Sequence, residues 1–333
     1  MAETPYHIVG VDMSPSSEGL FVADSSYVVP PAHNPYYLKV LTKICLKEKV
    51  AVLMPGSEPE LLEISRKKDA FLDIGVKPIV STPEAIEICS DKWKTAEFLR
   101  TNHFNHPKTL LIEDACDVSK IDFYPAIIKP AKSSSGSQNV FLAQTQEEAN
   151  FFSQCLCRQG QTPLVQEYIG SHEDEYTVGV LTLDDGQLIG SIALRRVITS
   201  GLSKKFQVRS YEGSETYIVS SGISQGEVRD FPKIRKYAEL VAEKLDARGP
   251  INIQGRNTKD GFHIFEINPR FSGTTSVRAL LGYNEPDILV RYYVLGEKPA
   301  KIHFKHGFVT RGLNESYIPF SKIKTLEEKA EHF

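Results

Sequence analysis

The sequence predicts a chain of two structural classes, an α/β region followed by an α+β region. Up to about residue 90, continuous apolar runs alternate with segments of helical spacing, which is typical of a parallel, doubly wound sheet. Beyond that point, several strand candidates come in pairs joined by tight turns, which indicates antiparallel hairpins. The chain has 333 residues. Single cores stop growing at roughly 250–300 residues, so we expect two or three sub-domains.

Composition and charge exclude several classes of protein. Charged residues make up 24% of the chain, near the globular average of about 25%. The formal net charge of -3 and the pI near 6.3 lack the strongly basic footprint of a nucleic-acid-binding protein. No apolar run approaches the ~20 residues of a membrane span, and the N-terminus lacks the features of a signal peptide. We therefore expect a cytoplasmic protein without nucleic-acid or membrane partners.

The five cysteines form no Cys-x-x-Cys pair, and their number is odd. Such a scattered set is typical of reduced cytosolic thiols rather than of a disulfide framework. The simplest interpretation is that they are small buried hydrophobic residues: Cys45, Cys89, Cys116, Cys155 and Cys157.

The first region, residues 1–90, is predicted to be an α/β domain. Its elements are buried strands at 7–12, 50–54 and 77–80, with helices at 36–48 and 58–74. A domain of this kind normally opens with a strand and a Gly-rich turn before its first helix. Here the chain begins at what looks like the second strand, so we expect the first strand to be missing, because that unit is absent or because the chain was trimmed.

The second region begins with a helix at 82–102, with Thr82 suited to its cap and Pro83 to its first turn. Hairpin turns are predicted at 184–186 and 259–261. Further strands are expected at 126–129, 140–143, 163–168, 175–183, 187–197, 251–256 and 262–267, and further helices at 146–158, 231–245, 277–281 and 286–295. The charged end, residues 325–333, is expected to fray.

The strongest chemical signal lies in the second hairpin. If residues 259–261 form a three-residue loop, the strand pairing places Gln254 opposite Glu266. Side chains alternate along a strand, so Glu266 and Asn268 share a face. Three oxygen donors would then converge, which suits a hard cation such as Mg²⁺ completed by phosphate oxygens. The alternative is a solvated face of an edge hairpin, and a one-residue change of register would turn Gln254 away.

The residues after this hairpin can bind anions. Arg270 could hold the oxygens of a transferring phosphoryl group or of an acyl phosphate, although a surface salt bridge explains it equally well. Ser272, Gly273 and Thr274 precede a short predicted helix and could offer backbone N–H groups to an anion. A plain turn is an equally good interpretation of those three residues.

Lys129 ends a predicted buried strand, where its charge is costly without a partner such as a phosphate. The loop that follows, residues 132–138, includes Ser135 and Gly136 and could close over phosphates with its backbone amides. Alone, such a stretch is more often a flexible linker.

A third signal is the strand end at residues 164–170. Its exposed backbone could present N–H and C=O groups to the edge of an adenine, and Glu175 could accept a ribose hydroxyl. Alone, this is an ordinary strand end.

The order of these residues along the chain resembles the ATP-grasp superfamily, specifically its carbamoyl-phosphate-synthase-like members. The order runs from Asp91-Lys92 to Lys129, Gln166 to Ile169, Glu175, the Gln254–Asn268 hairpin and Arg270. The resemblance covers most of the chain. It implies an ATP-grasp fold preceded by a truncated Rossmann-like domain. We expect a small lobe at 91–170 with the phosphate loop and a large lobe at 171–333 with the metal site.

The resemblance implies a role for each candidate residue. ATP would lie between the two lobes, beneath a loop (132–139) that excludes water. Its phosphates would contact Lys92, Lys129, Ser135 and Gly136, its adenine Gln166, Glu167, Tyr168 and Ile169, and its ribose Glu175. Two Mg²⁺ (or Mn²⁺) ions would be held by Gln254, Glu266 and Asn268. Arg270 and Lys129 would stabilise the transferring phosphoryl group.

The basic stretch at residues 195–205, which contains Arg196 and Lys204, lies where such proteins tend to face the acceptor substrate. It is a candidate grip for a carboxylate or phosphate, or else a solvated loop. Ser272, Gly273 and Thr274 are further substrate candidates.

The implied activity is a carboxylate–amine (or thiol) ligase that forms an acyl phosphate and converts ATP to ADP and phosphate. Its partners would be a small carboxylate and an amine, and a homodimer is possible. The second synthetase half and the regulatory domain of carbamoyl phosphate synthase are absent from this sequence, so we favour the ligase over a carboxylate or carbamate kinase. The third hypothesis is a non-catalytic ATP-binding scaffold.

Overall fold

The structure is a computed structural model that describes residues 5–113, 115–132, 139–199, 201–300, 302–313 and 316–330. The chain divides into two compact units. Unit 1 comprises residues 1–55, 63–78 and 313–333, and unit 2 comprises residues 56–62 and 79–312. In the part of the chain that is described, no helix is long and apolar enough to cross a membrane.

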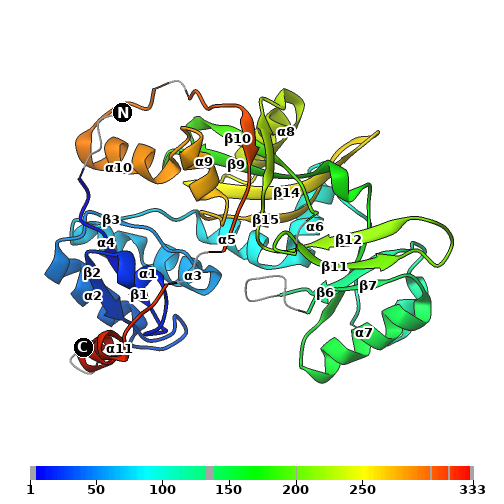
Figure 1. The fold of residues 1–333 in the computed structure, drawn as a ribbon, viewed down its shortest axis with the longest axis horizontal. Helices are drawn as coiled ribbons and strands as arrows, with labels where there is room; N and C mark the ends of the chain where they lie inside the picture. The colour runs from blue at the N-terminus through cyan, green and yellow to red at the C-terminus, as the bar shows by residue number, and fades with distance from the viewer. Residues whose placement is uncertain are drawn as a thin grey trace. The chain divides into compact units, whose positions relative to one another are not determined.

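Unit 1 is an α/β unit with short parallel strands (Figure 1). β1 (Val9–Asp12) pairs with β2 (Ser25–Val28), and β3 (Val52–Leu53) pairs with β4 (Lys77–Pro78), both in parallel. Its helices are α1 (Gly19–Val22), α2 (Tyr37–Glu48), α4 (Lys68–Asp73) and α11 (Phe320–Ala330), whereas α3 (Glu58–Arg66) begins in unit 2 and ends in unit 1. The parallel α/β pattern agrees with the predicted fold class.

Several elements of this unit differ from the prediction. The sequence predicts nothing between Asp12 and Tyr36, where the structure has α1 and β2. These elements have four residues each, too few to produce a periodic apolar signal. The predicted helix 58–74 is two helices, α3 and α4, and the predicted strand 50–54 is reduced to β3. The charged C-terminal segment is helical at α11 and buries Leu326, while residues 331–333 lie outside the described residues.

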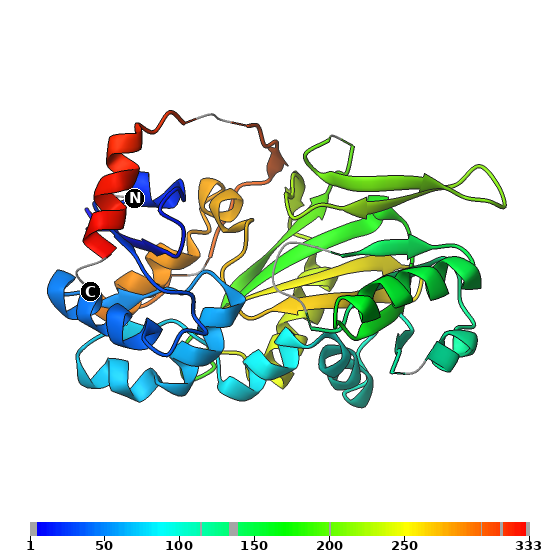
Figure 2. The ribbon, with the colours of Figure 1, turned by 90° about the horizontal axis from the view of Figure 1, so that it is seen from below.

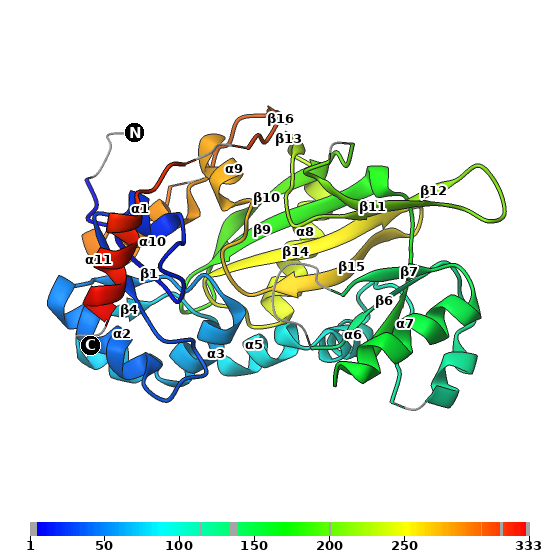
Figure 3. The ribbon, with the colours of Figure 1, turned by 60° about the horizontal axis from the view of Figure 1, so that its bottom comes forward.

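Unit 2 contains a four-stranded antiparallel sheet in the order β5-β8-β6-β7. Its strands are β5 (Thr109–Leu111), β6 (Ala126–Pro130), β7 (Phe141–Ala143) and β8 (Pro163–Glu167). Helix α7 (Gln146–Arg158) lies beside β6 and β7 (Figure 3). Leu156 of this helix joins Ile128 and Val165 in one apolar cluster. The chain between β5 and β6 includes the short helix η1 (Ala115–Lys120).

Unit 2 also contains a six-stranded antiparallel sheet, whose long strands are green and yellow in Figure 2. The strand order is β15-β14-β9-β10-β13-β16. Its strands are β9 (Glu175–Thr182), β10 (Leu188–Arg196), β13 (Gly226–Arg229), β14 (Pro250–Thr258), β15 (Gly261–Asn268) and β16 (Gly307–Val309). The predicted turn at 184–186 joins β9 to β10.

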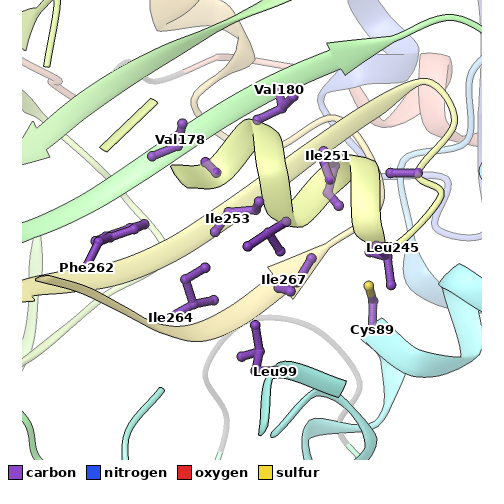
Figure 4. Close-up of a cluster of buried hydrophobic side chains, with 14 of the residues drawn as sticks. Cys89, Leu99, Val178, Val180, Leu245, Ile251, Ile253, Phe262, Ile264 and Ile267 are labelled. Carbon is purple, nitrogen blue, oxygen red and sulfur yellow. The ribbon is translucent and has the colours of Figure 1, made fainter. Parts of the chain in front are cut away.

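One face of this sheet is covered by helices α5 (Pro83–Ser90), α6 (Lys92–Thr101) and α8 (Pro232–Lys244). Ile251 and Ile253 of β14 and Ile264 and Ile267 of β15 belong to the apolar cluster on this face (Figure 4). Because side chains alternate along a strand, the residues between Ile251 and Ile253, and after Ile253, must point to the opposite face.

The hairpin of β14 and β15 contains a bulge that decides which residues reach that opposite face. Thr258 pairs with Gly261, so the loop has two residues and not the three that the sequence analysis assumes. The register then shifts, because Gly255 pairs with Ile264 whereas Gln254 pairs with Glu266, which leaves Phe265 as the extra residue. The predicted pairing of Gln254 with Glu266 is confirmed, but the bulge rather than the loop length produces it.

Unit 2 also has a hairpin of β11 (Lys204–Arg209) and β12 (Thr216–Ser220), which the sequence does not predict. Two helices, α9 (Thr275–Leu280) and α10 (Glu285–Leu295), follow β15 and correspond to predicted helices.

The bulge generates a stability prediction. A Cβ on Gly255 would lie 2.4 Å from the carbonyl oxygen of His263 and 2.7 Å from the ring of Phe262. We expect Gly255→Ala to lower the free energy of unfolding by about 1 to 3 kcal/mol, the cost of overpacking, seen as a lower urea midpoint. Gly307→Ala is the matched control, because a Cβ there meets nothing within 4 Å. Equal midpoints for the two variants would contradict the prediction.

Candidate active site

A cavity of about 280 Å³ lies in unit 2 and is lined by residues of both of its larger sheets. This volume is near the lower end of the roughly 300–1,000 Å³ found for small-molecule sites. The six-stranded sheet contributes polar side chains from the face opposite its apolar core: Glu175, Thr177, Arg196, Asn252, Gln254, Arg256, Glu266 and Asn268. The four-stranded sheet contributes Ile127, Lys129, Pro130, Gln166 and Glu167.

The three predicted metal ligands all line this cavity. Gln254 Nε2 donates a hydrogen bond of 2.8 Å to the Glu266 carboxylate, and Asn268 is buried at the end of the same strand as Glu266. One carboxylate and two amide side chains thus line one cavity, and oxygen donors of these types fit Mg²⁺ or Mn²⁺. Among the described residues, no group of three His, Cys, Asp or Glu side chains is placed to hold a metal ion.

Lys129 lies at the end of β6 and is buried. Its ammonium donates a hydrogen bond of 2.8 Å to the amide oxygen of Gln166, and the amide nitrogen of Gln166 donates to the hydroxyl of Thr109. Burial, reinforced by the charge of Lys92 and opposed by that of Glu266, lowers the pKa of Lys129 to about 7. Because the hydrogen-bond partner of Lys129 is a neutral amide, an anion in the cavity would stabilise the charged form of Lys129.

Lys92 also lines the cavity, at the first position of α6. Asp91 caps this helix by accepting hydrogen bonds from the backbone of Trp93 and Lys94. The backbone nitrogen of Lys92 donates to the carbonyl of Ala131, which directly follows β6. This bond ties the start of α6 to the end of the strand that carries Lys129. The predicted phosphate-loop residues Ser135 and Gly136 lie outside the described residues.

Arg270 lines the cavity beyond the metal candidates. Its guanidinium forms an ion pair of 3.1 Å with Glu58 and donates to the carbonyl of Phe271. Its buried Nε has no hydrogen-bond partner within the described ranges. Glu58 is a cavity residue that the sequence does not predict, because it precedes Arg270 by 212 positions and sits in an ordinary amphipathic helix.

Glu175 is the centre of a buried charge cluster. Its carboxylate accepts hydrogen bonds from Arg196 at 2.8 Å, Ser220 at 2.7 Å and Arg256 at 3.1 Å. Burial alone would raise the pKa of Glu175, but Arg196 and Arg256 outweigh it and hold that pKa below its usual value. Both oxygens of Glu175 are thus engaged within the protein. A ribose contact at Glu175 would have to compete with these bonds.

Arg196, a predicted substrate grip, is buried in the same cluster, where it also donates to the carbonyl of Ser221. It therefore connects β10 to the segment after β12. Lys204, the other predicted grip, is not among the residues that line the cavity, and its ammonium donates to Gln207 on the same strand. Ser200 of this basic stretch lies outside the described residues.

The predicted adenine-binding residues Gln166, Glu167, Tyr168 and Ile169 all line the cavity. Arg256 stacks on the Tyr168 ring at 4.1 Å and donates to the carbonyl of Ile169 at 3.2 Å. The hydroxyl of Tyr168 donates to the carbonyl of Ile218 on β12. These bonds hold the end of β8 against β14 and the β11–β12 hairpin.

The predicted substrate residues Ser272, Gly273 and Thr274 also line the cavity, and the hydroxyls of Ser272 and Thr274 are 2.6 Å apart. Two further cavity residues, Asn252 and Arg256, are missed by the sequence analysis. The alternation of side chains along the strand could have predicted them, because each is two positions from Gln254 on the same strand and therefore shares its face.

Three family models match the chain. A model described as "ATP-grasp in the biosynthetic pathway with Ter operon" matches residues 159–316, and a "RimK-like ATP-grasp domain" matches residues 89–219. A model described as "PylC-like, N-terminal domain" matches residues 2–79.

Among curated proteins, the chain is 25% identical over 236 residues to the carbamoyl phosphate synthase large chain of Thermoanaerobacter pseudethanolicus. This alignment covers 70% of the chain and 21% of the relative, so the matched region spans about a fifth of the relative's length.

Solved structures share the fold at low identity. N5-carboxyaminoimidazole ribonucleotide synthetase of Thermotoga maritima superposes with a TM-score of 0.58 at 20% identity, covering 89% of this chain and 71% of that one. L-amino acid ligase of Bacillus licheniformis gives a TM-score of 0.59 at 15% identity, with coverage of 81% and 63%. The biotin carboxylase domain of Hydrogenobacter thermophilus 2-oxoglutarate carboxylase, in complex with MgADP and bicarbonate, gives 0.58 at 16% identity, with coverage of 87% and 64%.

These matches agree with the order of the cavity residues along the chain and with the two sheets that enclose the cavity. The chain therefore contains an ATP-grasp domain preceded by a PylC-like N-terminal domain, and it is homologous to carbamoyl phosphate synthase large chains.

Proposed function

We propose that the cavity binds ATP and that the protein is a ligase that joins a carboxylic acid to an amine. One observation carries this proposal. A buried cation, Lys129, and an arginine, Arg270, line the same cavity as the oxygen donors Gln254, Glu266 and Asn268. Cations and metal ligands together suit the phosphates of a nucleotide, whereas neither set alone would distinguish ATP from another ligand.

In this proposal the nucleotide lies along β14. The adenine and ribose lie at the end near Tyr168, Ile169 and Glu175, and Lys92 and Lys129 contact the phosphates. Gln254, Glu266 and Asn268 would hold Mg²⁺, whose charge would offset the negative charge that develops on the phosphate oxygens. Ser135 and Gly136 belong to the proposed phosphate loop from their place in the sequence alone.

The proposed reaction has two steps. A carboxylate oxygen of the acid attacks the γ-phosphorus of ATP, ADP leaves, and an acyl phosphate forms. The nitrogen of the amine then attacks the carbonyl carbon, and phosphate leaves as the amide forms. In this proposal Arg270 exchanges its contact with Glu58 for a phosphate oxygen and stabilises the negative charge of the transferring phosphoryl group.

A second candidate is phosphorylation of bicarbonate or carbamate. It is favoured by the match to a carbamoyl phosphate synthase large chain and by the bicarbonate anion in the complex of the similar biotin carboxylase domain. The two candidates differ in whether ADP release requires an amine.

The ligase proposal predicts that ADP release is stimulated by a specific acid and amine together. It is measured by a coupled assay over a panel of small acids and amino acids, each tested with and without a second amine. Stimulation by bicarbonate alone would favour the second candidate. If no compound in the panel stimulates release although the nucleotide binds, the ligase proposal fails and a non-catalytic nucleotide-binding protein is the better description.

Lys129 generates a prediction about pH. With a pKa of about 7 in the free protein, Lys129 is mostly neutral at pH 8, and a bound phosphate would restore its charge. Binding at pH 8 should therefore take up about one proton, and uptake should be small at pH 6, where Lys129 is already charged. Affinity should accordingly fall as pH rises through 7.

Calorimetry with the Mg²⁺ complex of a non-hydrolysable ATP analogue, in buffers of different ionisation enthalpy, measures this uptake. Lys129→Met should abolish it. Lys92→Met should move the loss of affinity to higher pH, because Lys92 depresses the pKa of Lys129. Equal proton uptake by the wild type and Lys129→Met would contradict the assignment.

Glu266 generates a prediction about the metal. Glu266→Gln removes the carboxylate of the proposed ligand set while keeping its size. Paramagnetic resonance of Mn²⁺ with the same ATP analogue should show at least tenfold weaker metal binding. Glu97→Gln, which removes an exposed ion pair with Arg100 on α6, is the matched control and should bind Mn²⁺ as the wild type does. Unchanged Mn²⁺ binding by Glu266→Gln would rule out this ligand set.

A further inference from the structure

A buried ion pair lies behind the cavity and contacts one of its polar residues. Arg278 of α9 and Glu285 of α10 are both almost fully buried and lie 3.1 Å apart. The second guanidinium nitrogen of Arg278 donates a hydrogen bond of 2.5 Å to Asn252 Oδ1 on β14. Arg278 is not itself among the residues that line the cavity, whereas Asn252 is.

These contacts fix the orientation of the Asn252 amide. A guanidinium can only donate hydrogen bonds, so the Asn252 atom that faces Arg278 must be the oxygen. The hydroxyl of Thr177 donates to the same oxygen at 2.8 Å. With two donors on Oδ1, the nitrogen Nδ2 is held on the other side of the amide, and Oδ1 is not available to a metal ion.

The Nδ2 group of Asn252 is a hydrogen-bond donor that is not engaged by Arg278 or Thr177. In the described part of the chain it has no hydrogen-bond partner, although Asn252 is only 3% exposed. The Nδ2 atom itself is not fully buried. Because Asn252 lines the cavity, the exposed side of Nδ2 faces the cavity. A donor in this state needs an acceptor, because leaving a buried N–H unpaired costs about 1 to 3 kcal/mol.

The position of Asn252 indicates which acceptor it meets. Side chains two residues apart on a strand are about 7 Å apart. Asn252 therefore lies one such step beyond Gln254, on the side opposite to Arg256 and the proposed adenine end. It pairs across the hairpin with Asn268, and Arg278 brings the start of α9, with Ser272 and Thr274 before it, to the same end of the cavity.

We propose that Arg278, held by Glu285, is a positioning residue that keeps the amide nitrogen of Asn252 directed into the cavity, where it donates a hydrogen bond to a carboxylate oxygen of the acid substrate. This inference rests on the proposed function. It assigns no step of the reaction to Arg278, which acts through Asn252 alone.

Gly179 of β9 makes this arrangement possible. It pairs directly with Asn252, and a Cβ at this position would lie 2.2 Å from a guanidinium nitrogen of Arg278. The sheet thus has a gap at Gly179 that the Arg278 side chain occupies. Gly179→Ala should therefore displace the guanidinium without removing its charge.

The test follows the Asn252 amide directly, in protein labelled with ¹⁵N only in asparagine side chains. The signals are assigned by their loss in Asn252→Asp, which keeps an acceptor toward Arg278 but removes the N–H donors. Acetate, the probe for a carboxylate, is titrated with the Mg²⁺ complex of the non-hydrolysable ATP analogue present. In the wild type, the Asn252 amide signals should be sharp and should shift saturably with acetate.

The double variant Arg278→Met/Glu285→Gln removes both partners, so that no unpaired charge stays buried. We expect its Asn252 amide signals to broaden or move and its affinity for acetate to fall about tenfold, with affinity for the nucleotide analogue within twofold of wild type. Asn252→Asp should lose acetate affinity to the same extent. Gly179→Ala should move the Asn252 signals in the same direction as the double variant.

The matched control is Arg291→Met, which removes an ion pair with Asp287 on α10 and should leave the Asn252 signals unchanged. Wild-type Asn252 signals in both the double variant and Gly179→Ala would overturn the role of Arg278. If the Asn252 amide signals of the wild type do not shift at high acetate concentration, the proposed hydrogen bond to the acid is wrong. Failure of the nucleotide analogue to bind the wild type would instead refute the proposed function, while the signals of the free proteins would still test the positioning.

Discussion

The two faces of the β14–β15 hairpin have opposite chemical character, and the positions of the cavity residues depend on this. Ile251 and Ile253 pack in the apolar core, so Asn252 and Gln254 must point away from it. On β15 the same requirement would place Glu266 on the wrong face if the strand were regular. The extra residue at Phe265 corrects the alternation and brings Glu266 opposite Gln254.

The buried charges around the cavity fall into two groups. Glu175 and Glu285 are matched by arginines, and these bonds join segments that are far apart in the chain. Lys129, in contrast, is hydrogen-bonded to the neutral amide of Gln166, and Arg270, although it pairs with Glu58, keeps its buried Nε without a partner in the described structure, as Arg196 does. Loss of one partner of a buried ion pair would leave an uncompensated charge and destabilise the fold, whereas an incompletely matched cation favours an anionic ligand. The phosphate end of the proposed site is where the second group lies.

The two clusters of matched charges hold different ends of β14. Arg256 joins the Glu175 cluster to Tyr168 and Ile169, at one end of β14. Arg278 joins Glu285 to Asn252, toward the other end of that strand. Each polar residue on the cavity face of β14 is therefore held by a partner from another element. Such support is what keeps a polar group oriented before its ligand arrives.

Local patterns could be predicted from the amino-acid sequence: the alternation that groups Glu266 with Asn268, the strand that ends at Lys129, and the order of motifs that resembles ATP-grasp proteins. The pairing of Gln254 with Glu266 was predicted but the bulge was not, because a bulge depends on how two strands settle against a common core. Folding of the whole chain was needed to bring Glu58 to Arg270, to engage Arg196 with Glu175, and to place Arg278 behind Asn252. Those contacts join residues on separate elements, and periodicity within one element carries no information about which other element a side chain will meet.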